Sequence, residues 1–276
     1  MPTATPMVWP PKSNLFGVEV SVTNYQEVVR AIIQAALSGE RGVATFLPVH
    51  GIVTAATNSE FRKRINQCDV VAPDGQPVRW ALNFFDQADL TDRVYGPETM
   101  KRVCLRAAQN GIGIFLCGST PEVLEKLRAK LLGWYPTLII AGYESPPFRP
   151  MTPEENDALC ARINESGAAI VFIGMGCPRQ EILAHSNREK INAVQLCVGA
   201  AFDFHAGTKK MAPPFFQRHG LEWLYRLVTE PRRLWKRYLV TNSIFVVLVL
   251  FQMLKSFGSI LWGPDLDREP VRGHHA

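Results

Sequence analysis

The sequence predicts an α/β protein: a mostly parallel sheet with Rossmann-like helices on both faces, followed by a helical C-terminal appendage. Short apolar runs alternate with helical segments along most of the chain. Runs of this kind are typical of strands buried on both faces, and their spacing favours parallel strands joined by helices. The alternation stops near Gly207, and a basic segment that becomes strongly apolar follows it.

Six strands and five helices are expected. The strands are residues 43–48, 69–72, 112–117, 138–142, 169–174 and 194–198. The helices are residues 23–38, 97–110, 121–135, 153–166 and 178–190. Most of these helices have proline in their first turn, and several end near glycine or asparagine, as helix ends commonly do. Since ligands of parallel sheets bind beyond the carboxyl ends of the strands, a site is expected in the loops that follow them.

The 276 residues divide into four expected parts: a flexible leader (1–13), an α/β catalytic core (14–206), a basic and apolar appendage (207–262) and a polar tail (263–276). The net charge is +5 and is unevenly placed. Residues 207–255 contain nine Lys or Arg and two Glu, so they carry +7 and the remainder carries −2. This basic segment suits anionic lipid head groups or a phosphorylated ligand. No nucleic-acid partner is expected.

The apolar part of the appendage admits three interpretations. Residues 238–254 are 17 uncharged residues, which is marginal for a helix that spans a membrane. A helix lying in the membrane interface, with basic and aromatic residues, fits about as well and is the interpretation we favour. Packing between copies of the chain, as a homo-oligomer, is the third.

Several kinds of site are not indicated. The chain has no Gly-x-Gly-x-x-Gly fingerprint, which disfavours a Rossmann-type oxidoreductase, and it has no Walker loop. Its six cysteines form no Cys-x-x-Cys pair, so neither a zinc site nor a disulfide framework is indicated, and this usage fits the cytoplasm. Asp265 and Asp267 lie in the polar tail and are not interpreted as metal ligands. We expect no cofactor and no metal.

Four loops after predicted strands contain candidate functional residues. They are residues 45–50, 73–75, 118–120 and 174–181. The two glycine-rich loops, which begin at Gly118 and Gly174, could expose backbone N–H groups to a phosphate, although an ordinary tight turn explains each equally well. Asp74, between Pro and Gly, is a candidate general base, and the alternative is a turn-forming aspartate. His50 is a second candidate base, or a structural histidine.

Taken together, six motifs resemble the WecG/TagA/CpsF glycosyltransferases, glycosyltransferase family 26, and they occur in that family's order. They are Pro73-Asp-Gly75, Arg93-Val-Tyr-Gly-Pro97, Gly174-Met-Gly-Cys-Pro-Arg-Gln-Glu181, Val198-Gly-Ala-Ala-Phe-Asp203, Glu222-Trp-Leu-Tyr-Arg226 and Glu230-Pro-Arg-Arg233. The resemblance covers roughly residues 14–240. It implies the compact αβ architecture of the family with its C-terminal appendage.

The resemblance also implies an activity. A UDP-sugar-dependent hexosyltransferase would move N-acetylmannosamine, glucose or a related hexose, with inversion, onto a saccharide carried by polyprenyl diphosphate. The reaction would serve cell-surface or exopolysaccharide synthesis at the cytoplasmic face of the bacterial inner membrane, with the protein peripheral or monotopic. The family's proposed base maps onto Asp74, its glutamine onto Gln180 and its first-strand threonine onto Thr45. Leu47 stands where the family often has asparagine, so the resemblance does not settle the contact made by that amide or the choice of donor.

The expected mechanism is metal-independent. Asp74 would accept the proton of the acceptor hydroxyl, and arginines would bind the diphosphate of the leaving UDP. The expected substrate-binding residues are His50, Gly75, Arg93, Gly118, Gly174, Gly176, Arg179, Glu181, Arg218, Arg226, Arg232 and Arg233. For Arg232 and Arg233, a surface facing solvent or lipid is an equal alternative. The alternative for the whole chain is an inactive, membrane-associated scaffold of a polysaccharide assembly complex.

Overall fold

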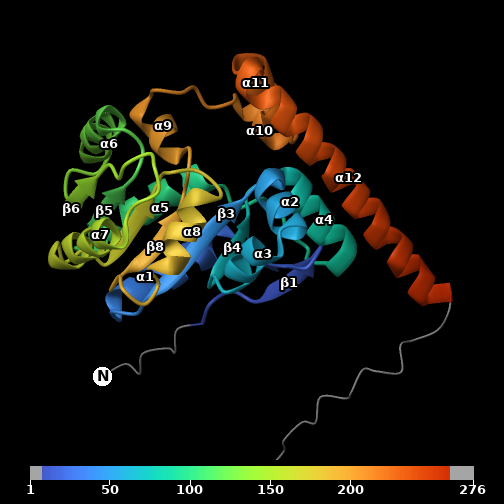
Figure 1. Ribbon diagram of the computed structural model, residues 1–276, viewed down its shortest axis with the longest axis horizontal. Helices are drawn as coiled ribbons and strands as arrows, with labels where there is room; N and C mark the ends of the chain where they lie inside the picture. The colour runs from blue at the N-terminus through green and yellow to red at the C-terminus, as the bar shows by residue number, and fades with distance from the viewer. Residues whose placement is uncertain (1–7, 262–276) are drawn as a thin grey trace, which may run out of the picture.

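The computed structural model describes residues 8–261, of which residues 256–261 are described by their backbone alone. Its centre is a six-stranded sheet in which every pairing is parallel (Figure 1). The strands are β3 (Gly42–Leu47), β4 (Val70–Pro73), β5 (Gly113–Cys117), β6 (Ile139–Glu144), β7 (Ile170–Ile173) and β8 (Val194–Cys197). All six predicted strands are therefore confirmed, as is the α/β class.

The strands lie in the order β4-β3-β8-β7-β5-β6, and helices cover both faces. One face packs against α1 (Tyr25–Leu37), α5 (Gly96–Asn110), α6 (Pro121–Trp134) and α9 (Ala201–Ala206). The other packs against α2 (Val49–Thr57), α3 (Ser59–Asn66), α4 (Gln76–Asp86), α7 (Pro153–Glu165) and α8 (Arg179–Ser186). Successive residues of a strand point to opposite faces, so Phe46 joins the first core and Leu47 joins the second.

Capping side chains explain where several helices start. Thr120 caps the start of α6, and Thr152 forms a capping box with Glu155 at the start of α7. The predicted helix over 178–190 was too long, because α8 ends at Ser186. Asn187 follows it as a fully buried side chain that exchanges two hydrogen bonds, of 2.7 and 2.8 Å, with Asn156 of α7.

The sequence analysis missed a hairpin beside the sheet. Strands β1 (Lys12–Leu15) and β2 (Val18–Ser21) are antiparallel and joined through Phe16 and Gly17, which both have positive φ. Before β1, Trp9 lies so close to Gly42 that a Cβ there would be 2.7 Å from its ring. The packed core therefore begins before Asn14, within the segment expected to be a flexible leader.

The appendage consists of three helices: α10 (Pro214–Arg218), α11 (Glu222–Thr229) and α12 (Pro231–Leu261). One side of α12 packs along α2 and the hairpin. Leu234, Thr241 and Phe245 are buried on this side, and the ring of Phe245 meets Phe16 edge-on with centroids 5.6 Å apart.

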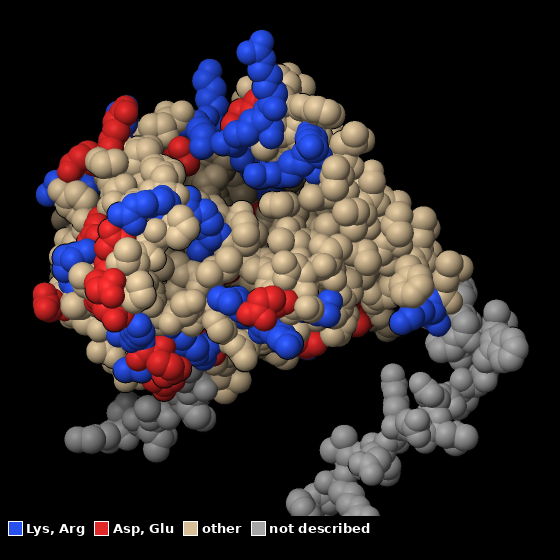
Figure 2. Space-filling model, in the orientation of Figure 1, with Lys and Arg blue, Asp and Glu red and all other residues tan. Residues whose placement is uncertain are grey.

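The other side of α12 is apolar and exposed. Its exposed side chains are Trp235, Leu239, Val240, Val246, Val247, Leu250, Phe251 and Leu254. By length and composition, residues 231–255 form a helix that could cross a membrane, with a mean hydropathy of 1.7. Only 11% of its apolar stretch is buried inside the protein. Figure 2 shows Lys and Arg gathered around the α11 end of the appendage, beside a hollow, whereas most of α12 carries no charge on this face.

The buried side of α12 should contribute most of the free energy that holds this helix against the core. We expect Phe245→Ala to lower the free energy of unfolding by about 3 kcal/mol, because it leaves a cavity against Phe16. Phe251→Ala, at a side chain that is 57% exposed, should change it by about 0.5 kcal/mol or less. Urea denaturation of both variants tests this, and equal losses would contradict the packing described.

Candidate active site

Asp74 lies at the carboxyl edge of the sheet, directly after β4. Its backbone N–H donates to Leu47 O of the neighbouring strand at 3.3 Å. Its carboxylate Oδ2 accepts the N–H of Gly96, the first residue of α5, at 3.0 Å. The unpaired N–H groups at a helix start favour a negative charge there. The residue as a whole is partly exposed, while its carboxyl lies in poorly hydrated surroundings.

The surroundings of Asp74 raise the pKa of its carboxyl to about 7. Burial is the main cause, since it disfavours the charged form, and Glu222 acts in the same direction. Arg93, the N–H of Gly96 and Arg226 act in the opposite direction. A carboxyl that titrates near neutral pH is suited to accept a proton from a substrate.

Beside Asp74, a buried network joins the core to the appendage. Arg93 Nη2 donates to Glu222 Oε2 of α11 at 2.8 Å, and the two side chains are only 8% and 13% exposed. Tyr95 donates its hydroxyl to Glu222 Oε1 at 3.0 Å, and the guanidinium of Arg93 lies 4.1 Å from the centroid of the Tyr95 ring. Gln217 of α10 accepts a weaker bond of 3.3 Å from Arg93. Arg93, expected to bind substrate, is thus paired within the protein.

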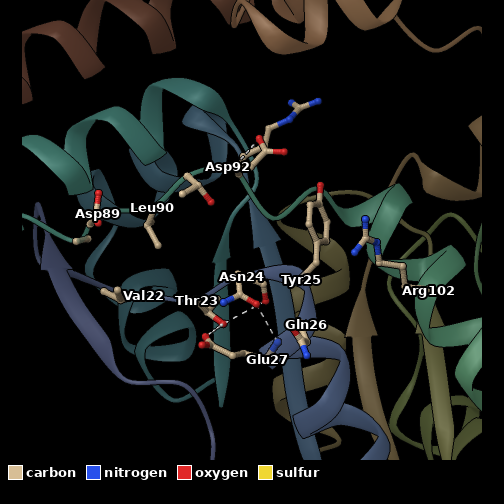
Figure 3. A pocket seen from close by; sticks show the side chains of 13 residues that line it. Val22, Thr23, Asn24, Tyr25, Gln26, Glu27, Asp89, Leu90, Asp92 and Arg102 are labelled. Carbon is tan, nitrogen blue, oxygen red and sulfur yellow. Dashed lines mark hydrogen bonds between the residues drawn. The ribbon is translucent and has the colours of Figure 1, made fainter.

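A surface cavity of about 480 Å³ adjoins this network at Arg93 (Figure 3). It is lined by the start of α1, including Tyr25, and by the loop that carries Asp92 and Arg93. In Figure 3, Tyr25 stands between Arg102 and this loop, and its hydroxyl accepts the N–H of Tyr95 at 3.0 Å. The cavity therefore shares Tyr25 and Arg93 with the surroundings of Asp74.

Thr45 and Gln180 form a second group, through Glu181. Thr45 Oγ1 and Gln180 Nε2 both donate to Glu181 Oε1, at 3.0 and 2.8 Å. Gln180 Oε1 accepts the N–H of Gly176 at 3.1 Å, which ties the group to the loop after β7. All three side chains are buried, and burial raises the pKa of Glu181. Glu181 thus fixes the positions of the Thr45 and Gln180 side chains by accepting a hydrogen bond from each.

Close packing explains one glycine in each of the two post-strand loops, Gly174 and Gly118. A Cβ on Gly174 would lie 2.5 Å from the ring of Phe202. A Cβ on Gly118, where φ is +119°, would lie 2.9 Å from Met175 and 3.0 Å from the backbone of Gly174. Gly176 differs, because no atom lies within 4 Å of its Cβ position. Only the last of these leaves room beside the backbone, and Gly75 is likewise uncrowded at the start of α4.

His50 lies in the first turn of α2, and its side chain is half-buried. Burial, together with the nearby charge of Arg237, lowers the pKa of its ring to about 4. His50 is therefore neutral at pH 7, and its Nδ1 has no hydrogen-bond partner within the described part of the chain. A neutral ring can accept or donate a hydrogen bond to a substrate, whereas a pKa this low makes it a weaker base than Asp74.

The remaining candidate arginines differ in surroundings. Arg226 of α11 lies near Asp74 and over the ring of Phe204, 5.8 Å from its centroid. Arg179 lies 6.0 Å from the ring of Phe148 and is exposed, as are Arg218 and Arg232. Arg233 is exposed and forms an ion pair of 2.6 Å with Glu230. The charge of Arg226 therefore acts on Asp74, whereas Arg179, Arg218, Arg232 and Arg233 lie at the surface.

Four members of the network around Asp74 were not selected from the sequence: Tyr25, Tyr95, Gln217 and Glu222. Tyr95 and Glu222 lie within motifs that were recognised, and Glu222 is one of two acids in the basic segment 207–255. An acid in so basic a segment was the feature of the sequence that could have pointed to Glu222. In the described residues, no three His, Cys, Asp or Glu side chains are grouped so as to hold a metal ion.

The sequence of the chain also matches the model of a known protein family. Residues 13–258 match the model of the glycosyl transferase WecG/TagA/CpsF family. The chain belongs to this family. It is accordingly a glycosyltransferase of the kind used in cell-surface polysaccharide synthesis, and the family implies a sugar donor and a lipid-linked acceptor.

The raised pKa of Asp74 has a cost in stability that can be measured. Between its ordinary value near 3.8 and about 7, the folded state keeps a proton that the unfolded state loses, so stability falls as pH rises through this window. Asp74→Asn keeps an acceptor for the N–H of Gly96 and removes the titrating carboxyl, and with it this pH-dependent loss of stability. We expect the variant to gain roughly 1–3 kcal/mol relative to wild type between pH 4 and pH 8. A difference that stays constant across this pH range would contradict the assignment.

Proposed function

We propose that the protein transfers a hexose, with inversion, from a UDP-sugar to a saccharide carried on polyprenyl diphosphate, and that Asp74 is the general base. The observation that carries this proposal is the position of Asp74, half-buried at the carboxyl edge of a parallel sheet with a pKa raised to about 7. Ligands bind at this edge in such folds. N-acetylmannosamine and glucose-type sugars are the donors to test first.

The reaction would be a single in-line displacement. The acceptor hydroxyl oxygen forms a bond to the anomeric carbon, the bond from that carbon to the UDP oxygen breaks, and the hydroxyl proton passes to Asp74. Gln180 and Thr45, held by Glu181, would keep the loop after β7 in place against the donor. Inversion follows because attack and departure take place on opposite sides of one carbon.

The leaving UDP develops negative charge on its diphosphate, which cations and N–H donors stabilise. Arg226 lies near Asp74, and further Lys and Arg side chains surround the hollow at the α11 end (Figure 2). One guanidinium group can donate two parallel hydrogen bonds to a phosphate. We therefore propose that these arginines stabilise the leaving group without a metal ion.

The exposed side of α12 fits a membrane surface. Its buried side is packed on α2 and Phe16, so lipid could not surround the helix unless that packing were lost. A helix with one apolar exposed side and a basic end is suited to lie in the interface of an anionic bilayer. We propose that the protein is peripheral, at the cytoplasmic face of the inner membrane, where lipid-linked acceptors are reached.

Asp74→Asn should lower the rate of transfer by about 10²–10⁴-fold, because the acceptor then lacks its base. Purified protein, a panel of UDP-sugars and lipid-linked acceptors, with detection of the extended glycan, measures this. The wild-type rate should persist in excess chelator, and a loss reversed by Mg²⁺ or Mn²⁺ would refute metal independence. Unchanged polymer synthesis in cells carrying Asp74→Asn would favour the inactive scaffold instead.

Leu250→Ser combined with Phe251→Ser should weaken binding to vesicles that contain phosphatidylglycerol by roughly tenfold or more, because two exposed apolar side chains no longer enter the bilayer. Leu105→Ser, at a side chain of α5 that is 42% exposed, is the matched control and should have no effect. Cosedimentation measures both. Carbonate should release the wild-type protein from cell membranes, and retention after this wash would indicate a spanning helix.

A further inference from the structure

We propose that Glu222 is a positioning residue: by pairing with Arg93 it offsets the positive charge that acts on Asp74, and it thereby couples docking of α11 to the pH dependence of transfer. This inference rests on the proposed role of Asp74. It concerns a residue of the appendage that reaches no reacting atom itself and acts through Arg93.

The geometry places Glu222 where it controls Arg93. The carboxylate accepts from Arg93 at 2.8 Å through one oxygen and from the hydroxyl of Tyr95 at 3.0 Å through the other. Both oxygens are thus engaged, and the side chain is largely withdrawn from water. Tyr95 also precedes Gly96, whose N–H holds the Asp74 carboxylate. Glu222 therefore contacts the same short segment that carries the partner of the base.

The pairing of Glu222 with Arg93 also affects how readily the Asp74 carboxyl ionises. The charged and titratable groups that influence Asp74 come from three parts of the fold: Tyr25 of α1, Arg93 and Tyr95 before α5, and Glu222 and Arg226 of α11. Arg93 alone would favour the ionised carboxylate and make it a weaker base. Glu222 offsets that positive charge at short range in a poorly hydrated place, where screening is weak.

The docking of α11 supplies this compensation. Residues 207–255 contain only one other acid, Glu230, and it forms its ion pair with Arg233. When α11 is released, Arg93 loses its buried partner and its charge acts on Asp74 without compensation. The pairing therefore links the state of the appendage to the strength of the base, in addition to any role in holding the two parts together.

The test compares two charge-altering variants. We expect Glu222→Gln to lower the pKa of Asp74, and with it the acid limb of the pH–rate profile, by roughly one pH unit. We expect the double variant Arg93→Gln/Glu222→Gln to return both toward wild type, because the uncompensated positive charge is gone. Glu98→Gln is the control: Glu98 forms an exposed ion pair with Arg102 on α5, and neither quantity should change.

Titration of Asp74 by NMR with ¹³C-labelled aspartate, assigned by its loss in Asp74→Asn, needs no substrate. Hydrogen exchange of residues 222–229 reports docking in each variant. Whether α11 stays docked or is released, the Glu222→Gln variant leaves the charge of Arg93 without its partner. An unchanged or raised pKa of Asp74 in this variant therefore overturns the inference. A double variant that stays at the value of Glu222→Gln also overturns it. Failure of wild-type transfer with every donor would instead refute the proposed function, whatever the titration shows.

Discussion

The buried ion pair between Arg93 and Glu222 is the constraint on which the arrangement of the site depends. A buried pair adds little net stability, because desolvation offsets much of the attraction, but loss of one partner leaves an uncompensated charge and is strongly unfavourable. The pair therefore specifies where α11 lies more than it stabilises the fold. With Tyr95 and Gln217 completing its hydrogen bonds, the appendage has one register against the core. Arg226 is carried to Asp74 by the same placement.

The sheet supplies the other half of the site. Parallel strands end at one edge, and the helices that follow begin there, so N–H groups without helical partners collect around the loops. Asp74 uses this directly, since its carboxylate is held by the first N–H of α5. Thr45, Gln180 and Glu181 form their own buried group on the side of α8. The site thus combines one accessible acid with a rigid frame that is closed to water.

The sequence predicted the sheet because most residues of β3, β4, β5, β7 and β8 are buried and form short apolar runs, and the edge strand β6, although only partly buried, begins with an apolar run as well. It missed the hairpin at Phe16, whose strands have only four residues each and are fixed in part by a hydrogen bond from Asn66, 49 residues away, to Gly17. Asp74 was recognisable from its residue type and its place after a strand. The role of Glu222 was not, because its partner Arg93 is 129 residues distant and only the fold brings the two together.

The long helix that lies flat along α2, with one side packed and the other bare, has a consequence for how substrate is found. A protein held to a bilayer in this way meets a lipid-borne acceptor by lateral diffusion within a plane. Its encounter rate then follows the number of carriers per unit of membrane area rather than their amount per volume of cytoplasm. A sugar-nucleotide donor, in contrast, would still arrive from three-dimensional solution. Under the proposed function, one site would take its two substrates from spaces of different dimension.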